Sequence, residues 1–240
     1  MPYYFYGFDW TYLILVLPCF ILAFWASSNV NRTFKRYAKV FSSNKITGQQ
    51  AAQRVLMRHG IKDVEIEHVG GNLTDHYDPK SNVIRLSDSV YNSASVSAIG
   101  VACHEAGHAV QYAQGYSPIR LRAAIIPITN IGSKLAMPLI LLGVLLSAVG
   151  YYSYIFVYIG IGCFALSSIF QLITLPVEFN ASRRAIEAIE ISGILQQDEL
   201  TGAKKTLTAA ALTYVAALAV SLAQLLRLII LFGGRRRRYD

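Results

Sequence analysis

Hydrophobic residues in this chain gather in long stretches, where a soluble domain would show short amphipathic patterns. Such stretches occupy residues 10–26, 137–150, 151–175 and 207–234. A helix needs about 20 apolar residues to cross a membrane. The two middle stretches meet near Gly150, so we expect them to cross the membrane and return as a hairpin. The first stretch predicts an uncleaved N-terminal anchor, and the last predicts a C-terminal apolar helix.

The more polar sequence after the first stretch predicts a small folded domain. Residues 46–60 show helical spacing of apolar positions, with Thr47 as N-cap and Gly60 as C-cap. Residues 64–69 and 82–87 alternate in the manner of short strands, with turn-forming residues before and between them. A small sheet with a helix is the simplest arrangement.

Composition and charge support a membrane protein and suggest its orientation. The 240 residues are 54% hydrophobic and only 15% charged, with a formal net charge of +8. Soluble chains carry about 25% charged residues. Basic residues cluster at 32–39 and 120–134, and Lys and Arg favour the cytoplasmic side of a membrane. We therefore expect the N-terminus outside and the central region, from residue 30 onward, in the cytoplasm.

The basic tail Arg235–Arg238 conflicts with this orientation. Four full spans that start outside would leave the tail outside, against the charge rule. The last stretch is partly interfacial or re-entrant, or the tail breaks the rule, or the first assignment is wrong; the side of the C-terminus stays open. The simplest partner of the tail is the anionic surface of the lipid bilayer. The chain contains no nucleic-acid-binding module, and we expect no nucleic-acid partner.

The strongest chemical signal is the motif His104-Glu105-Ala106-Gly107-His108 in the helical segment 93–115. Residues i and i+4 share one helix face, so the two imidazoles can bind one Zn²⁺, and Glu105 beside them can take a proton from water at the metal. Two polar residues on an exposed helix face would be the alternative. The surrounding Ala, Val, Ile, Gly and Cys residues weigh against it, because unpaired polar groups are costly to bury among them.

A catalytic zinc site, with one Zn²⁺ per chain, requires a third protein ligand from elsewhere. The candidates are His59, His68, His76, Glu178, Glu187 and Glu190. Glu178 fits best, because a membrane hairpin returns the chain to the surface from which it left. An interfacial charge is the alternative for Glu178. For Glu187 and Glu190, a solvated helix face is the preferred interpretation. His76, a candidate for a supporting role in the cleft, is more simply part of a turn-rich surface loop.

The segments HEAGHAVQ, LTDHYDPKSNVIRLS and LPVEFNASRRA resemble the neutral zinc metallopeptidases of the bacterial YugP type, over nearly the whole chain. Their order is also similar to that of the Ste24/HtpX membrane proteases. The resemblance implies a zinc-dependent endopeptidase of the gluzincin sort. In those relatives the glutamate motif is E-F-x-A-D, and its Asp orients a zinc histidine; here Ser182 replaces the Asp, and it can support a zinc ligand only more weakly.

Together these observations predict a mainly α integral membrane protein with a small α+β cytoplasmic zincin-like domain, in which the HExxH helix and the Glu helix flank a transmembrane hairpin. The expected parts are an N-terminal anchor (1–28), a cytoplasmic metallopeptidase part (29–123), the hairpin (135–175), a cytoplasmic helix with the third ligand (176–206), and an apolar helix with the basic tail (207–240).

The expected function is hydrolysis of peptides or membrane proteins at the cytoplasmic surface of the cell membrane. An extended substrate would add to the edge of the small sheet, for which residues 82–87 are the candidate strand; a purely structural strand is the equal alternative. A non-catalytic zinc-stabilised scaffold is the main rival function, but it would not need Glu105. An intramembrane protease or a transporter fits less well, because the apolar stretches contain few polar groups. A membrane-protein partner or a second copy of the chain stays open.

Overall fold

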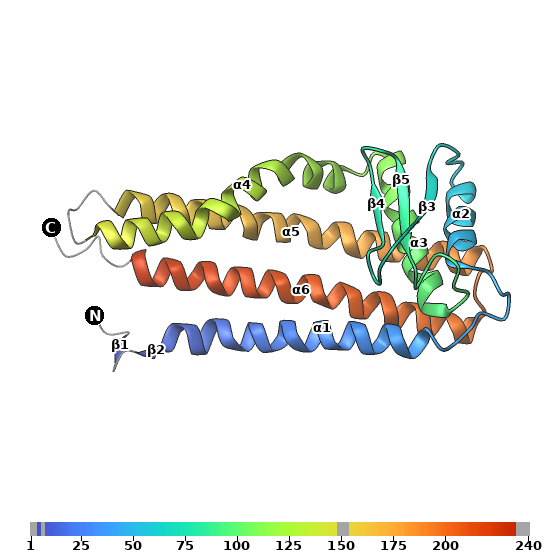
Figure 1. Ribbon diagram of the computed structural model, residues 1–240, viewed down its shortest axis with the longest axis horizontal. Helices are drawn as coiled ribbons and strands as arrows, with labels where there is room; N and C mark the ends of the chain where they lie inside the picture. Colours follow the sequence, from blue (N-terminus) through green and yellow to red (C-terminus); the bar gives the residue numbers. More distant parts are fainter. Residues whose placement is uncertain (1–3, 6–7, 148–153, 234–240) are drawn as a thin grey trace. The chain divides into compact units, whose positions relative to one another are not determined.

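The computed structural model describes residues 4–5, 8–147 and 154–233, and these form two compact units. The helical unit takes its residues from 1–25, 121–174 and 214–240, and the mixed unit consists of 26–120 and 175–213. Four long helices contribute residues to both units (Figure 1). Residues 235–238, the basic tail, lie outside the described residues.

Four helices are long and apolar enough to cross a membrane: Tyr12–Tyr37, Ser117–Leu146, Tyr154–Ile191 and Gln197–Gly233. The first consists of a π-helical turn η1 (Tyr12–Val16) and α1 (Leu17–Tyr37), and the others are α4, α5 and α6. They bear out the expected membrane protein. The short strands β1 (Tyr4–Phe5) and β2 (Phe8–Asp9) precede them.

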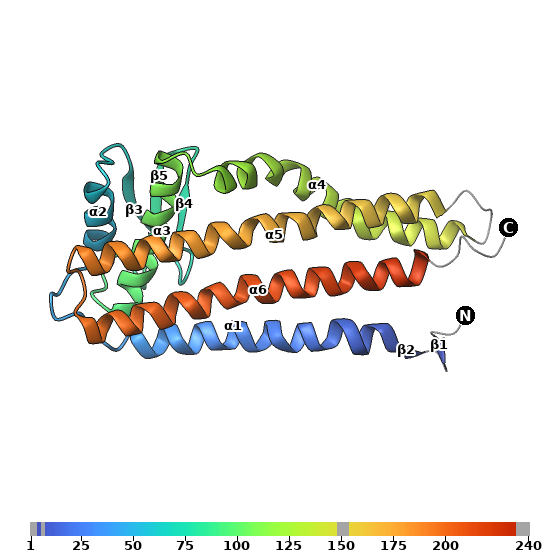
Figure 2. The ribbon, with the colours of Figure 1, turned by 180° about the vertical axis from the view of Figure 1, so that it is seen from behind.

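Two of these helices differ from the expected pattern. α4 begins at Ser117, well before the apolar stretch, and it contains Pro127 and Pro138, which account for its visible bend (Figure 2). α5 continues through Pro176, where the sequence suggested an end. Proline removes only one helical hydrogen bond, so the flanking turns can carry the helix across it.

Within the helical unit, an ion pair joins the two ends of the chain's helical part. Arg227 of α6 pairs with Asp9, which also accepts hydrogen bonds from Thr11 and from the backbone N–H of Tyr12. The Arg227 guanidinium also lies 5.5 Å from the centre of the Tyr12 ring, within cation–π range. The start of the first helix and the end of α6 therefore lie together.

The mixed unit contains a three-stranded sheet and two shorter helices. The helix α2 (Gly48–Arg58) starts at the predicted N-cap Thr47, which forms a capping box with Gln50. The strands are β3 (Glu65–Val69), β4 (His76–Asp78) and β5 (Val83–Ser87), in the order β3-β5-β4. β5 pairs in parallel with β3 and antiparallel with β4.

This sheet order corrects two predictions. The strand from 82–87 is not an edge strand, because β5 lies in the middle with a partner on each side. The supposed surface loop around His76 is instead the short edge strand β4. The Asp, Asn and Pro residues around β4 obscure it in the sequence, and its pairing with β5 outweighs their preference for turns.

The core of the mixed unit lies between the sheet and its helices. α3 (Val96–Ala113) begins at the N-cap Ser95 and packs against α2, β4 and β5 (Figure 1). Its apolar residues join those of α2, β5, and the nearby ends of α5 and α6 in one buried cluster. The helix that contains the HExxH motif is therefore packed on several sides.

Candidate metal centre

Three side chains with metal-binding atoms meet between α3 and α5. His104 and His108 lie one turn apart on α3, and Glu178 extends from the neighbouring turn of α5. The two helices approach closely, because Gly107 faces the Ala181 carbonyl: a Cβ at 107 would lie 2.7 Å from that oxygen. The absence of a side chain at position 107 thus permits the meeting of the three donors.

The distances in this group suit a zinc ion. Nε2 of His104 lies 3.2 Å from Oε2 of Glu178, and Nε2 of His108 lies 3.6 Å from the same oxygen. Zinc bonds of about 2.0–2.1 Å in tetrahedral geometry place neighbouring donors roughly 3.3–3.4 Å apart. One ligand atom from each residue lies within 4.8 Å of the others. Two imidazoles and a carboxylate are also the donor set of a catalytic zinc.

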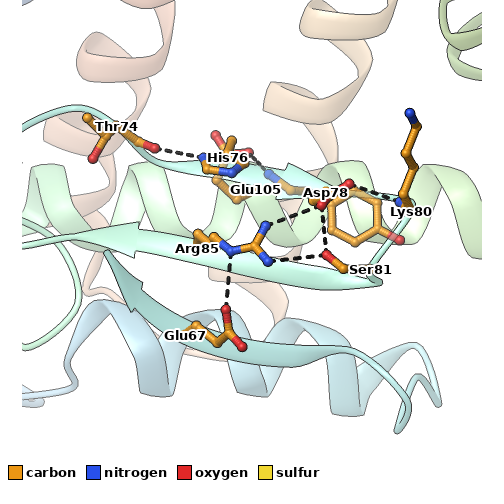
Figure 3. Close-up of polar contacts among 9 residues, drawn as sticks. Glu67, Thr74, His76, Asp78, Lys80, Ser81, Arg85 and Glu105 are labelled. Atoms are coloured by element: carbon orange, nitrogen blue, oxygen red, sulfur yellow. Dashed lines mark hydrogen bonds and ion pairs between the residues drawn. The ribbon is translucent and has the colours of Figure 1, made fainter. Parts of the chain in front are cut away.

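Glu105 lies apart from this group and faces the sheet. Its Oε2 accepts a hydrogen bond of 3.0 Å from the backbone N–H of Tyr77 in β4. Figure 3 shows Glu105 beside β4, while Arg85 on β5 bridges Glu67 and Asp78 on the two outer strands. This hydrogen bond holds one oxygen of the Glu105 carboxylate against β4.

Nδ1 of each histidine, the ring nitrogen that does not face Glu178, also has a partner. Nδ1 of His104 lies 3.1 Å from Oγ of Ser182, and Nδ1 of His108 lies 3.0 Å from Oε1 of Gln111. Burial alone would lower the pKa of His108, but the nearby carboxylates of Glu178 and Glu105 outweigh burial and raise it. A metal ion at Nε2 of His108 competes with a proton for that nitrogen.

The other candidate ligands lie elsewhere. The His59 ring is hydrogen-bonded to the carbonyl of Val55, and the His68 ring to Asp88. His76 is exposed, and its Nδ1 lies 2.8 Å from the carbonyl oxygen of Thr74. The remaining acidic candidates, Glu187 and Glu190, are exposed on α5.

The sequence analysis missed three supporting residues. Gln111 follows His108 at i+3 and therefore shares its helix face, a spacing visible in the sequence. Tyr77 contributes only its backbone, which no side-chain pattern could reveal. Asp75 accepts hydrogen bonds from the N–H and the hydroxyl of Ser87, at 2.7 and 2.9 Å, and ties the start of β4 to the end of β5. Burial raises the pKa of Asp75, and the charge of Glu105 raises it further.

Comparison with known proteins gives one consistent result. Residues 12–233 match the family described as "Putative neutral zinc metallopeptidase". The chain is also 45% identical over 225 residues to the "Putative membrane protease YugP" of Bacillus subtilis (strain 168), an alignment that covers 94% of this chain and 98% of that protein. No solved structure matches the chain. Because the family match runs from the first apolar helix to the end of the last, the chain belongs to the family of neutral zinc metallopeptidases that this description names.

Proposed function

We propose that the protein is a membrane-bound zinc endopeptidase of the gluzincin type, with its site at the cytoplasmic surface of the membrane. The observation that supports this most directly is the meeting of His104, His108 and Glu178 at zinc-ligand spacing, with Glu105 beside them but outside the group. A structural zinc site would be closed by four protein ligands and would not need Glu105. This favours catalysis over a zinc-stabilised scaffold.

The proposed reaction is hydrolysis of a peptide bond by water. Bound zinc would lower the pKa of water toward about 7 and polarise the scissile carbonyl. Glu105 takes the proton of the attacking water and later delivers it to the leaving amine. The Tyr77 N–H holds the Glu105 carboxylate in place through this cycle. His104, His108 and Glu178 hold the metal, and Ser182 and Gln111 support the two rings.

The substrate would be an extended segment of a peptide or a membrane protein. β4 is an edge strand, with β5 as its partner in the sheet, and its Tyr77 N–H points toward Glu105. A peptide that adds to this edge would run past the proposed proton acceptor. β4 thus takes the role that the sequence suggested for residues 82–87.

Removal and return of the metal tests the proposal directly. The full-length protein, purified in detergent, should contain about one zinc per chain and should cleave an unfolded protein. A strong chelator should abolish cleavage, and stoichiometric Zn²⁺ should restore it, whereas Mg²⁺ should not, because Mg²⁺ prefers oxygen ligands in octahedral geometry. Zinc content near zero in the purified protein, or cleavage that persists after complete removal of the metal, would contradict the proposal.

The proposed orientation predicts which positions an impermeable thiol reagent reaches in intact cells. In a variant without the three native cysteines, Lys62→Cys in the exposed loop before β3 should be labelled only after lysis. Gly233→Cys, at the exposed end of α6, should be labelled from outside. Labelling of Lys62→Cys in intact cells would reverse the orientation, and protection of both positions would show that α6 does not cross fully.

A further inference from the structure

A line of side-chain amides between α3 and α5 joins the outer nitrogen of His108 to an arginine. Gln111, less than one turn after His108, is fully buried. Its Oε1 lies 3.0 Å from Nδ1 of His108, and its Nε2 donates to the Val177 carbonyl and to Oδ1 of Asn180, at 2.9 Å each. Asn180 Oδ1 in turn accepts a hydrogen bond of 2.7 Å from Nε of Arg184.

Groups that can only donate or only accept a hydrogen bond determine which way the amides of Gln111 and Asn180 are turned. A backbone carbonyl can only accept, so the NH₂ group of Gln111 must face Val177. A guanidinium can only donate, so Asn180 must turn its oxygen toward Arg184, and that same oxygen receives the second hydrogen of the Gln111 NH₂ group. Both constraints direct Oε1 of Gln111 toward His108.

The direction of the line determines the tautomer of His108. An amide oxygen can only accept, so Nδ1 of the ring carries the hydrogen. In the neutral ring, Nε2 then has a free lone pair, and Nε2 is the nitrogen that faces Glu178. The hydroxyl of Ser182 imposes no such choice on His104, because a hydroxyl can donate or accept.

We propose that Gln111 is a positioning residue that fixes the tautomer and ring orientation of His108 for metal binding, and that Asn180 and Arg184 hold its amide in the required direction. The inference rests on the proposed function, because it takes His108 to be a metal ligand. Carboxylates, carbonyls or water support most metal-binding histidines in this way. Here a neutral amide does so, and it adds no further negative charge to a site that already contains Glu105 and Glu178.

Two replacements of Gln111 separate support of the metal from support of the fold. Gln111→Leu removes the acceptor for Nδ1 of His108, whereas Gln111→Glu keeps an acceptor there. Both lose the donor to the Val177 carbonyl and to Asn180. Gln53→Leu is the matched control, because it makes the same chemical change on α2, outside the line that runs from His108 to Arg184. Each variant is made in the full-length protein.

The zinc dissociation constant, measured by competition with a chromogenic chelator, should rise about 10- to 100-fold in Gln111→Leu. In Gln111→Glu it should equal or fall below the parent's value, and in Gln53→Leu it should not change. Thermal unfolding of the metal-free protein should rank the variants differently from zinc affinity: both Gln111 variants should be less stable than the parent. If Gln111 supported only the fold, zinc affinity and thermal stability would fall together in both Gln111 variants.

Equal losses of zinc affinity in Gln111→Leu and Gln111→Glu would overturn the inference, as would parental affinity in Gln111→Leu. Absence of zinc from the parent protein would overturn the proposed function and this inference together, before any variant is compared. A parent that binds zinc but cleaves nothing would overturn the proposed function alone, since the affinity series would still decide the role of Gln111.

Discussion

Replacement of Glu105 with glutamine should reduce peptide hydrolysis by about 10²- to 10⁴-fold while the zinc content stays near that of the parent. Glu105 accepts a hydrogen bond from the Tyr77 N–H and stands outside the group formed by His104, His108 and Glu178. Glutamine has the same size, and its carbonyl oxygen can keep the bond to Tyr77. It cannot accept the proton of water, so only the proton-transfer step should suffer. Initial rates on an unfolded protein and zinc per chain are the two measurements.

Glu187→Gln is the matched control for this variant, because it makes the same chemical change at an exposed position of α5. It should retain both activity and zinc. Parental rates in Glu105→Gln would show that another group accepts the proton. Loss of zinc together with activity would show that Glu105 supports the metal or the fold instead.

Local sequence was sufficient to propose the two histidines and Glu105 as one group. Their relation depends only on helical periodicity, because residues four apart share a face whatever the rest of the fold does. The N-cap of α2 at Thr47 was predictable for the same reason. These features are decided by neighbours within one or two turns of the chain.

Glu178 required a longer argument, since 74 residues separate it from His104. The apolar stretches between them indicated a chain that leaves and returns, and this made Glu178 the best candidate. What the sequence did not reveal is why α3 and α5 come so close. That depends on the absence of a side chain at Gly107 opposite the Ala181 carbonyl, a contact between distant segments.

The strand β4 was the main error, and its cause is non-local. The residues around His76 favour turns, but the strand forms because Tyr77 pairs opposite Ile84 and because Asp75 binds Ser87 at the end of β5. Strand order is equally invisible in a short alternating pattern, and so the middle strand was taken for an edge. As a result, the free sheet edge beside Glu105 was assigned to the wrong strand.

Replacement of Glu178 with glutamine should weaken zinc binding by more than about 100-fold. This exceeds the usual effect of removing a residue that only hydrogen-bonds a zinc ligand. Activity should fall with zinc occupancy. The Glu178 side chain is 2% exposed, and its Oε2 lies near Nε2 of both histidines. Glutamine keeps the volume, so the buried packing survives, but a neutral amide is a poorer zinc ligand than a carboxylate. Competition with a chelator measures the affinity, and saturating zinc should restore part of the activity.

Glu190→Gln, at an exposed position three turns further along α5, provides the control and should bind zinc as the parent does. Far-ultraviolet circular dichroism should show the same helix content in both variants. If Glu178→Gln keeps full zinc affinity, the third ligand is another residue, and the close approach of α3 and α5 must serve the fold alone. If both affinity and helix content fall, Glu178 supports the packing of the two helices. A loss of affinity with the helices intact is the result that only a metal ligand at position 178 explains.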